Sequence, residues 1–297
     1  MTLAGEKAVN RGSTRARVRL ASRPMTRSLT ILLAVVLAAL AAAAPAIAHD
    51  RDVDVVTYNI HHAAGVDERL DLERIARVID ATGADVAALQ EVDRHWGARS
   101  EFVDQAGWLA RRLRMHVVYG ANLDLEPEQP GQPRRQYGTA ILSDFPIHSW
   151  RNTLLPRPEG GEQRGLLEAV VNVRGARVRI ANTHLQHNSA VERTAQALRI
   201  AELLDGGREP IVLTGDLNAR PADPELAPLF ARFADAWTLG GIGDGFTLPA
   251  EAPTARIDYV LTSRAIGVES ARVVPTLASD HLPVVAELEL PRRTRSE

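Results

Sequence analysis

Most apolar runs in this sequence end in, or lead into, residues that can bind a metal ion or move a proton. The ends of strands meet at the edge of a sheet, so these side chains could converge in one pocket. Carboxylates with an amide oxygen suit a hard cation such as Mg²⁺, and two imidazoles suit general acid–base work or anion stabilisation. The residues are Asn59, Glu91, His184, Asp216, Asn218, Asp258, Asp280 and His281.

Each of these positions also has a plainer interpretation when it is taken alone. Asn59 could form a turn at a strand end, Glu91 could be a solvated charge, and His184 could be a core histidine. The Gly-Asp-Leu-Asn segment at 215–218 is more specific, because a buried apolar run rarely stops in this pattern merely to turn. Asp258 lies within a predicted strand, where a buried acid needs a partner such as an imidazole.

Composition restricts the chemistry that these residues can perform. The chain has 297 residues, 45% of them apolar and 24% charged, which is typical of a globular protein and not of a disordered or collagen-like one. It contains no Cys, which excludes a thiol nucleophile and Cys-ligated zinc or iron–sulfur centres. Carboxylate, amide, imidazole and hydroxyl chemistry remains.

Hydrophobic periodicity predicts mixed α/β structure with substantial antiparallel pairing, in one domain over about residues 50–290. Helices are expected from Leu72 to Gly83, over 103–113, and from a Ser189–Glu192 capping box to Gly206. The long connections 125–136 and 156–165 are possible walls of a substrate site. Strands are predicted over 53–58, 85–90, 139–143, 167–173, 177–182, 210–214, 257–261 and 283–290.

The first 48 residues have the pattern of a Sec-type secretory signal peptide. A basic segment precedes an apolar core at 29–44, and Ala46-Ile47-Ala48 predicts cleavage before His49. Met25 would be a more ordinary start for such a signal. We therefore expect a secreted protein whose domain covers 49–297; an uncleaved leader would instead make it membrane-anchored.

Removal of this leader would make the protein acidic. The remaining residues include 28 basic and 36 acidic side chains, a formal net charge of −8 with His neutral. Such a domain lacks the broad positive field that drives sequence-independent nucleic-acid binding, although a local basic groove or a bound metal could supply positive charge. A nucleic-acid substrate would favour a basic groove, and the sequence offers the compact basic pair Arg134-Arg135. A membrane substrate would favour an exposed aromatic hairpin, but the Trp residues are scattered. Neither feature decides between these substrates.

Taken in order, the segments from 53 to 290 resemble the endonuclease/exonuclease/phosphatase superfamily, which includes DNase I-like nucleases, 5-phosphatases and bacterial sphingomyelinases. The resemblance implies an α/β (α+β) fold, a DNase I-like four-layer α/β/β/α sandwich in a single domain, with the active site at one end of two packed sheets. It is carried by Thr-Tyr-Asn59-Ile, Leu-Gln-Glu91-Val, Tyr137-Gly-Thr-Ala-Ile-Leu-Ser143, Gln-Arg164-Gly, Asn-Thr-His184-Leu, Gly-Asp216-Leu-Asn218, Ile-Asp258-Tyr and Ser-Asp280-His281.

The resemblance also implies a metal site. Glu91 would bind a divalent ion, Mg²⁺ or alternatively Mn²⁺, with Asn59 and Asp280 completing or supporting the shell. This chain departs from the pattern at His61-His62, where some nuclease members carry an acidic residue two positions after the Asn. A second metal at that place is therefore doubtful.

The remaining roles that the resemblance implies concern the phosphate. Asp216 would orient or deprotonate the attacking water, and His281, held by Asp258, would stabilise or protonate the phosphate in the transition state. The imidazole of His184 favours the sphingomyelinase, 5-phosphatase and DNase I-like branches over abasic-site endonucleases. Catalytic roles are thus implied for His184, Asp216, Asn218, Asp258 and His281, and substrate binding for Arg164.

These observations favour an exported, Mg²⁺-dependent phosphoesterase that acts on a small or lipid-derived phosphodiester. One alternative is a DNase I-like endonuclease on nucleic acid. Another is a non-catalytic binding module on the same fold, because a fold does not determine a function. No protein partner is implied, and we expect a monomer.

Overall fold

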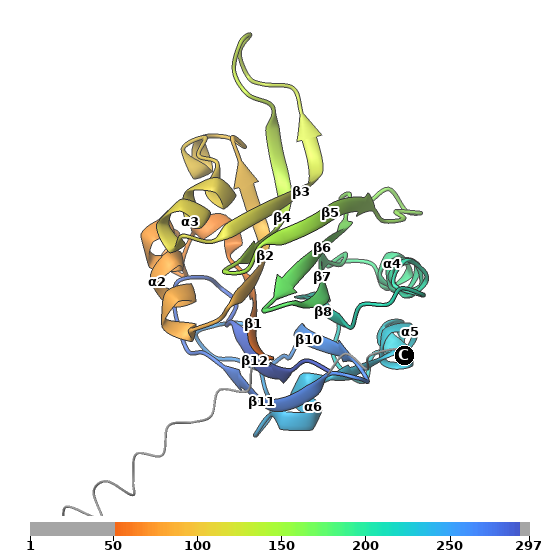
Figure 1. Ribbon diagram of the computed structural model, residues 1–297. Helices are drawn as coiled ribbons and strands as arrows, with labels where there is room; N and C mark the ends of the chain where they lie inside the picture. Colours follow the sequence, from red (N-terminus) through yellow and green to blue (C-terminus); the bar gives the residue numbers. More distant parts are fainter. Residues whose placement is uncertain (1–50, 292–297) are drawn as a thin grey trace, which may run out of the picture. The chain divides into compact units, whose positions relative to one another are not determined.

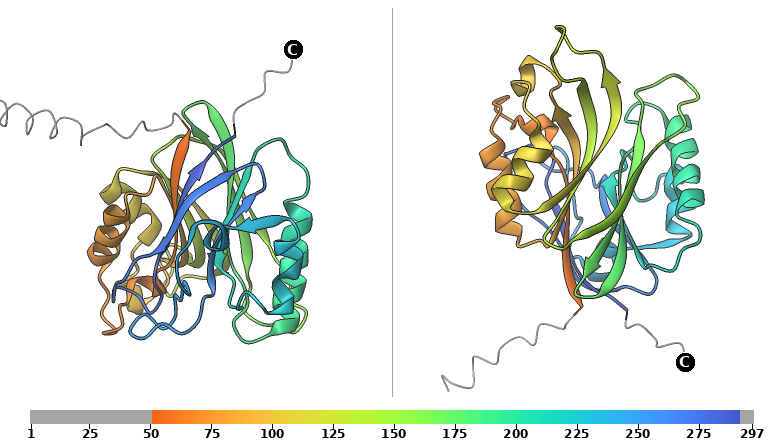
Figure 2. Two further views of the ribbon diagram at one scale, coloured as in Figure 1. Left: turned by 90° about the horizontal axis from the view of Figure 1, so that it is seen from below. Right: turned by 45° about the horizontal axis from the view of Figure 1, so that its top comes forward.

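Two six-stranded sheets pack face to face, and helices cover the outer face of each sheet (Figures 1 and 2). The computed structural model describes residues 51–291. This arrangement is the predicted four-layer α/β/β/α sandwich in a single domain. The predicted signal peptide, its cleavage site and the alternative start at Met25 lie outside the described residues.

The first sheet combines strands from the two ends of the described chain, and the second sheet takes its strands from the stretch between them. The first sheet contains β1 (Asp52–Asn59), β2 (Val86–Arg94), β3 (His116–Leu125), β4 (Arg135–Ser143), β11 (Gly267–Val273) and β12 (Val284–Glu289), in the spatial order β11-β12-β1-β2-β4-β3. The second contains β5 (Ile147–Leu154), β6 (Gly165–Val173), β7 (Ala176–His184), β8 (Ile211–Asp216), β9 (Phe233–Asp235) and β10 (Asp258–Ser263), in the order β5-β6-β7-β8-β10-β9.

The helices divide between the two outer layers and the loops. Their bounds are α2 (Leu72–Thr82), α3 (Gln105–Leu113), α4 (Ala190–Leu203), α5 (Ala227–Phe230) and α6 (Ala236–Gly240), with 3-10 helices η1 (His61–Ala63), η2 (Ala98–Ser100) and η3 (Pro224–Leu226). Within residues 51–291, no helix has both the length and the apolar character needed to cross a bilayer.

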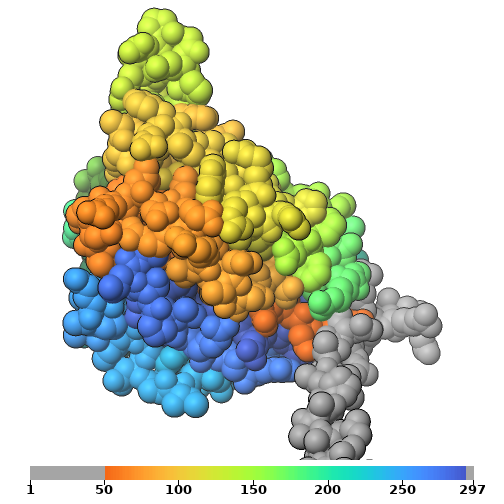
Figure 3. Space-filling view, turned by 90° about the vertical axis from the view of Figure 1, so that its left-hand side faces the viewer, coloured from red at the N-terminus to blue at the C-terminus, as the bar shows by residue number. Residues whose placement is uncertain are grey.

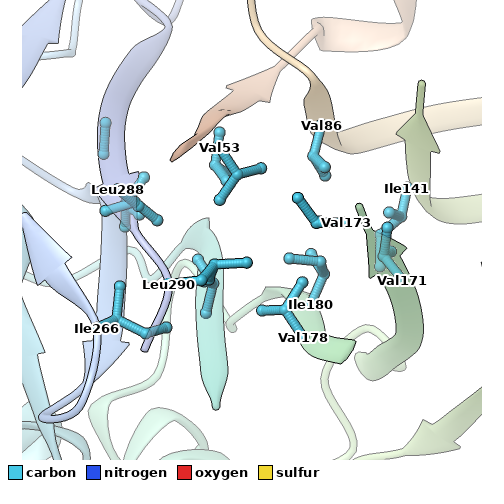
Figure 4. Packing of buried hydrophobic residues seen from close by; sticks show 14 of the residues in the cluster. Val53, Val86, Ile141, Val171, Val173, Val178, Ile180, Ile266, Leu288 and Leu290 are labelled. Carbon is cyan, nitrogen blue, oxygen red and sulfur yellow. The ribbon is translucent and has the colours of Figure 1, made fainter. Parts of the chain in front are cut away.

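The alternation of side chains along the strands creates separate cores on the two faces of each sheet. In β1, Val53 and Val55 belong to the core between the sheets, whereas Val56 and Tyr58 pack in the core beneath α2 and α3. Figure 4 shows Val and Ile side chains of both sheets meeting in the central core. Each fully buried side chain of this size contributes about 1.5–3 kcal/mol to stability.

Caps fix where the two long helices begin. The Asp71 side chain accepts a hydrogen bond from Arg74 N before α2. Ser189 accepts one from Glu192 N before α4, as the capping box predicts. Glu192 does not complete that box, however, because its carboxylate accepts hydrogen bonds from the backbone of the 156–165 loop, at Glu159 N and Gly161 N. Glu192 therefore holds the 156–165 loop against the start of α4.

The prediction missed the strands β3, β5, β9 and β11. All four lie at sheet edges, where most of their residues are exposed or only partly buried. The predicted 125–136 connection is shorter than expected, because β3 runs to Leu125 and β4 begins at Arg135. Its remaining residues form the tip of a hairpin that projects from the molecule (Figures 1 and 3).

A buried amide network joins the two sheets near the ends of β1 and β7. From β7, Asn182 Nδ2 donates to the carbonyls of Leu89 and Ala140 in the first sheet, each over 2.9 Å. Gln90 Nε2 donates to Asn182 Oδ1 over 2.7 Å and to Thr57 Oγ1 over 3.0 Å. Every donor in this network is inaccessible to water, so its loss cannot be compensated by solvent.

Replacement of Asn182 by Ala should destabilise the fold by about 2–4 kcal/mol, because two buried carbonyls lose their donor and a small cavity remains. Urea unfolding followed by circular dichroism measures this free energy. Asn188→Ala, at an exposed position, is the control and should change stability by less than about 0.5 kcal/mol. A loss below about 1 kcal/mol for Asn182→Ala would show that the network does not join the sheets energetically.

Candidate active site

The predicted polar residues converge at one edge of the two packed sheets. His184 and Asp216 are the last residues of the parallel strands β7 and β8, and they lie opposite each other in the register. Asp216 also lies opposite Asp258, which is the first residue of the antiparallel strand β10 and not an interior residue as predicted. Asn59 ends β1 in the facing sheet, and His281 lies in the loop before β12.

A polar pocket of about 280 Å³ opens between these strand ends. Six of the predicted site residues line it, while Asn59 and Asp258 lie behind its wall and Asp280 lies outside it. The lining residues are Glu91, Tyr137, Glu162, Arg164, His184, His187, Asp216, Asn218 and His281.

Asp258 and His281 form a buried pair. The Nδ1 atom of His281 lies 2.9 Å from Asp258 Oδ2, and both side chains are almost inaccessible to solvent. Because the carboxylate accepts the Nδ1 proton, the Nε2 atom is left facing the pocket, 3.7 Å from Asp216 Oδ2. The partner that a buried acid at position 258 requires is therefore His281.

Asp216 lies at the centre of the constellation. Its Oδ2 accepts a hydrogen bond from Asn59 Nδ2 over 3.1 Å, and its Oδ1 accepts one from Asn218 N over 2.9 Å. The His184 Nε2 atom lies 3.5 Å from the same Oδ2. Burial raises the pKa of Asp216 to about 7; the charge on His281 opposes this rise and that on Asp258 adds to it.

The two imidazoles of the pocket have opposite protonation tendencies. Burial disfavours charge on His281, but the carboxylates of Asp258 and Asp216 outweigh burial and raise the pKa of His281 to about 10. Burial and the nearby charge of Arg164 hold the pKa of His184 well below its usual range. The pocket therefore has one cationic imidazole and one neutral imidazole near neutral pH.

Arg164 orients the neutral imidazole. Its guanidinium donates to His184 Nδ1 over 3.0 Å and lies 2.9 Å from Glu162 Oε1. A His184 ring that accepts at Nδ1 carries its proton on Nε2, which points toward Asp216 and the pocket. Arg164 is buried, so it acts on this side of the pocket mainly by positioning His184.

A β-bulge aims Glu91 into the pocket. The pairing of β2 with β4 shifts register between Leu89 and Val92, and Glu91 has a left-handed backbone with φ of 57°. Glu91 was expected just after a strand, whereas β2 continues past it to Arg94. Its Oε1 accepts a hydrogen bond from Asn59 Nδ2 over 3.1 Å, so Asn59 connects Glu91 to Asp216.

Potential metal-binding atoms gather beside Glu91. Single donor atoms of His61, His62 and Glu91 lie within 4.8 Å of one another, and Asp280 Oδ1 lies 3.8 Å from His61 Nδ1. The Asn59 amide oxygen already accepts a hydrogen bond from His61 N, so Asn59 supports this group from behind. Burial, with the charges of Arg99 and His61, lowers the pKa of His62.

Sequence reasoning did not select three pocket residues. Tyr137 belongs to a quoted motif without an assigned role, and Glu162 lies in the loop 156–165 that was predicted to be a wall. His187 follows His184 by three residues, beyond the end of β7. Their contribution depends on how the loops fold over the sheet edge, so no periodic signal marks them.

Comparisons with known proteins agree with this arrangement. A model of the "Endonuclease/Exonuclease/phosphatase family" matches residues 56–281. A solved endonuclease/exonuclease/phosphatase structure from Beutenbergia cavernae is similar with 31% identity and a TM-score of 0.68, over 81% of this chain and 72% of that chain. A mannosyl-6-phosphatase from Bacteroides thetaiotaomicron shares the fold, with 18% identity and a TM-score of 0.66 over 80% and 99% of the two chains.

One curated relative matches over a shorter segment. It is Protein cwh43 of Schizosaccharomyces pombe, 30% identical over 115 residues, which are 38% of this chain and 11% of that protein. The match therefore spans about a ninth of the relative's length.

Proposed function

This chain belongs to the endonuclease/exonuclease/phosphatase family, and we propose that it is a divalent-metal-dependent phosphoesterase that hydrolyses a small or lipid-derived phosphodiester. One observation carries the proposal. The Asp216 carboxylate lies 3.5 Å and 3.7 Å from the Nε2 atoms of two imidazoles, His184 and His281, in a pocket that also contains Glu91. A base, two N–H donors and a separate carboxylate are the groups that hydrolysis of a phosphate ester requires.

Each side chain of the pocket has a separate role toward a phosphate that is bound there. Asp216, fixed by Asn59 and by Asn218 N, accepts a proton from the attacking water. His184 donates from Nε2 to a non-bridging oxygen, because Arg164 occupies its Nδ1 atom. Both imidazoles thus approach the phosphate through their Nε2 atoms.

His281 stabilises the negative charge that develops on the phosphate in the transition state. Its ring is held in place and kept protonated by Asp258, so Nε2–H can donate to a phosphate oxygen or to the departing oxygen. Because this imidazolium is already fixed in place, it can neutralise the negative charge that builds up on the phosphodiester without reorganisation at the moment of reaction.

The residues beside Glu91 fit the divalent ion that the family generally requires. Glu91 offers a carboxylate on the pocket wall, Asp280 offers a second one 3.8 Å from His61, and Asn59 holds Glu91 in place. When bound there, the ion would neutralise charge on the phosphate oxygens. We propose Mg²⁺ or Mn²⁺ for this role.

Two features favour a small or lipid-derived substrate over nucleic acid. The pocket is only about 280 Å³. Arg134 pairs with Asp124 and Glu126, and Arg135 pairs with Glu128, so the basic pair on the hairpin is neutralised within that hairpin. It supplies no free positive field to a polynucleotide backbone.

A substrate panel tests the proposal. Purified mature protein with Mg²⁺ or Mn²⁺ should hydrolyse bis-p-nitrophenyl phosphate and one of sphingomyelin or a small natural phosphodiester faster than plasmid DNA. Faster cleavage of DNA would identify a nuclease instead. Binding of these compounds without turnover would identify a non-catalytic module.

Glu91→Gln should lower kcat/KM by about 10- to 100-fold and weaken the response to added metal, because an amide is a poorer ligand for a hard cation than a carboxylate. Metal titrations of initial rates measure both effects. Glu202→Gln, an exposed position on α4, is the matched control and should behave as wild type. An unchanged metal response in Glu91→Gln would remove Glu91 from the metal site.

The pH profile of kcat/KM should be bell-shaped. Activity should rise with pH as Asp216 loses its proton near pH 7, and fall as His281 loses its proton near pH 10. Asp258→Asn removes a negative charge that raises both pKa values, so both limbs should move to lower pH. Rates measured from pH 5 to 11 check this, and a flat profile between pH 6 and 8 would contradict the role of Asp216.

Export is a separate part of the proposal. The signal pattern before His49 supports secretion of the enzyme. N-terminal sequencing of protein from the culture medium should begin at or near His49. Recovery of the intact leader in the membrane fraction would establish an anchored enzyme.

A further inference from the structure

The mechanism above leaves two adjacent histidines without a task. His61 and His62 belong to η1, the 3-10 helix that follows β1, and they lie beside Glu91 of the pocket wall. Their Nδ1 atoms are buried, and neither has a hydrogen-bond partner among the described residues. A buried polar atom without a partner is costly and needs an explanation, such as a bound ion.

The spacing of the donors matches a shared ion. One donor atom from each of His61, His62 and Glu91 lies within 4.8 Å of the others. Donors about 2.1 Å from one tetrahedral ion are about 3.4 Å apart, so an ion would draw any of these atoms that lie farther apart together by about 1 Å. The distance of 3.8 Å between His61 Nδ1 and Asp280 Oδ1 is already close to this spacing.

The backbone is held in an uncommon conformation to present these groups. His61, His62 and Ala63 have positive φ angles of 45°, 43° and 67°, and Glu91 has 57°. Non-glycine residues adopt this region at a cost, and such strain concentrates at functional sites.

Two hydrogen bonds maintain this strained turn. Asn59 Oδ1 accepts from His61 N over 3.0 Å, and Gln105 Nε2 donates to His62 O over 2.7 Å. Both hydrogen bonds are made to backbone atoms, so they fix the turn and leave the Nδ1 atoms of the two imidazoles without a hydrogen bond from residues 51–291.

We propose that His61, His62 and Glu91 bind one first-row transition ion, with Asp280 as a further oxygen donor, and that the site prefers Zn²⁺ to Mg²⁺. Imidazole nitrogen binds Zn²⁺ well, whereas a shell of oxygen atoms alone would favour Mg²⁺ or Mn²⁺. The inference rests on the proposed function, because Glu91 belongs both to the proposed phosphoesterase pocket and to this group of ion ligands. It changes the expected cofactor of the enzyme from a hard ion to a borderline one.

Pulsed electron paramagnetic resonance of Mn²⁺ bound to the EDTA-treated wild-type protein tests this directly. Coupling of the electron spin to ¹⁴N nuclei is expected, because imidazole nitrogen would lie in the first coordination shell. Isothermal titration should show Zn²⁺ binding about 100-fold or more tighter than Mg²⁺. A wild-type spectrum without ¹⁴N coupling overturns the proposal, and this result needs no variant.

Variants then assign the ligands. His61→Ala and His62→Ala should each weaken Zn²⁺ binding by about tenfold or more, and the double variant should lose the ¹⁴N coupling, with Mg²⁺ affinity nearly unchanged. The control is His148→Ala, an exposed histidine on β5, which should bind as wild type. Unchanged Zn²⁺ affinity in the folded double variant would contradict the assignment.

The outcomes separate this inference from the proposed function. Ester hydrolysis with Mg²⁺ in a protein that shows no ¹⁴N coupling would overturn the transition-ion site and leave the phosphoesterase intact. Strong ¹⁴N coupling in a protein that hydrolyses no phosphate ester would support the site and contradict the proposed function.

Discussion

Asp216→Asn is expected to lower kcat by about three orders of magnitude, because the amide cannot accept the proton of the attacking water. The substitution preserves shape, and Asn218 N can still donate to the side-chain oxygen, so the pocket should keep its form. Steady-state kinetics on bis-p-nitrophenyl phosphate measure the loss. KM should change much less than kcat, since the interaction removed belongs to the transition state.

The control for this variant is Asp205→Asn, an exposed acid that pairs with Arg232. It should retain wild-type kinetics. If folded Asp216→Asn kept more than about a tenth of the wild-type kcat, Asp216 would not be the base.

Removing the Asp258–His281 pair is expected to have the next largest effect. Each of Asp258→Asn and His281→Ala should lower kcat by roughly two orders of magnitude or more. The hydrogen bond of 2.9 Å fixes the ring and favours its charged form, so neither residue functions without the other. The double variant should therefore be little worse than His281→Ala alone.

A double-mutant cycle on kcat measures this coupling. Losses that multiply in the double variant would show that the two residues act independently, contrary to the assignment. Substrates with poorer leaving groups should lose more rate if His281 protonates the departing oxygen. An equal loss across leaving groups would assign His281 to the non-bridging oxygens.

Much of the site could be predicted from sequence because polar residues at strand ends share an edge. The parallel pairing of β7 with β8 brings His184 beside Asp216, and the antiparallel pairing of β8 with β10 brings Asp258 to the same level. Both pairings follow from strands whose apolar runs are short and clear. The layer arrangement came from the family resemblance, since periodicity alone does not reveal how two sheets stack.

Other features depended on irregular backbone or on tertiary contacts. The bulge that turns Glu91 into the pocket lies between Leu89 and Val92, and the sequence there has no residue type that marks a bulge. Edge strands such as β5 are mostly exposed and lack an alternating pattern. Glu192 resembled half of a capping box, yet it binds a distant loop that competes for its carboxylate.

The turn at His61 and His62 illustrates a further limit. The family resemblance places His61-His62 where some nuclease members carry an acidic residue, but it does not reveal that the Nδ1 atoms are buried without a hydrogen-bond partner among residues 51–291. Only the positive φ angles and the position of Glu91 indicate that the imidazoles and the carboxylate form a single group.

The central claim is that this pocket hydrolyses phosphate esters with the help of a divalent ion. The most direct measurement is the initial rate of bis-p-nitrophenyl phosphate hydrolysis by EDTA-treated protein, before and after Mg²⁺, Mn²⁺ or Zn²⁺ is restored, for wild type and Asp216→Asn. The rate should fall by about 100-fold or more in EDTA and recover with metal in wild type only. Full activity in EDTA, or equal recovery in Asp216→Asn, would contradict the claim.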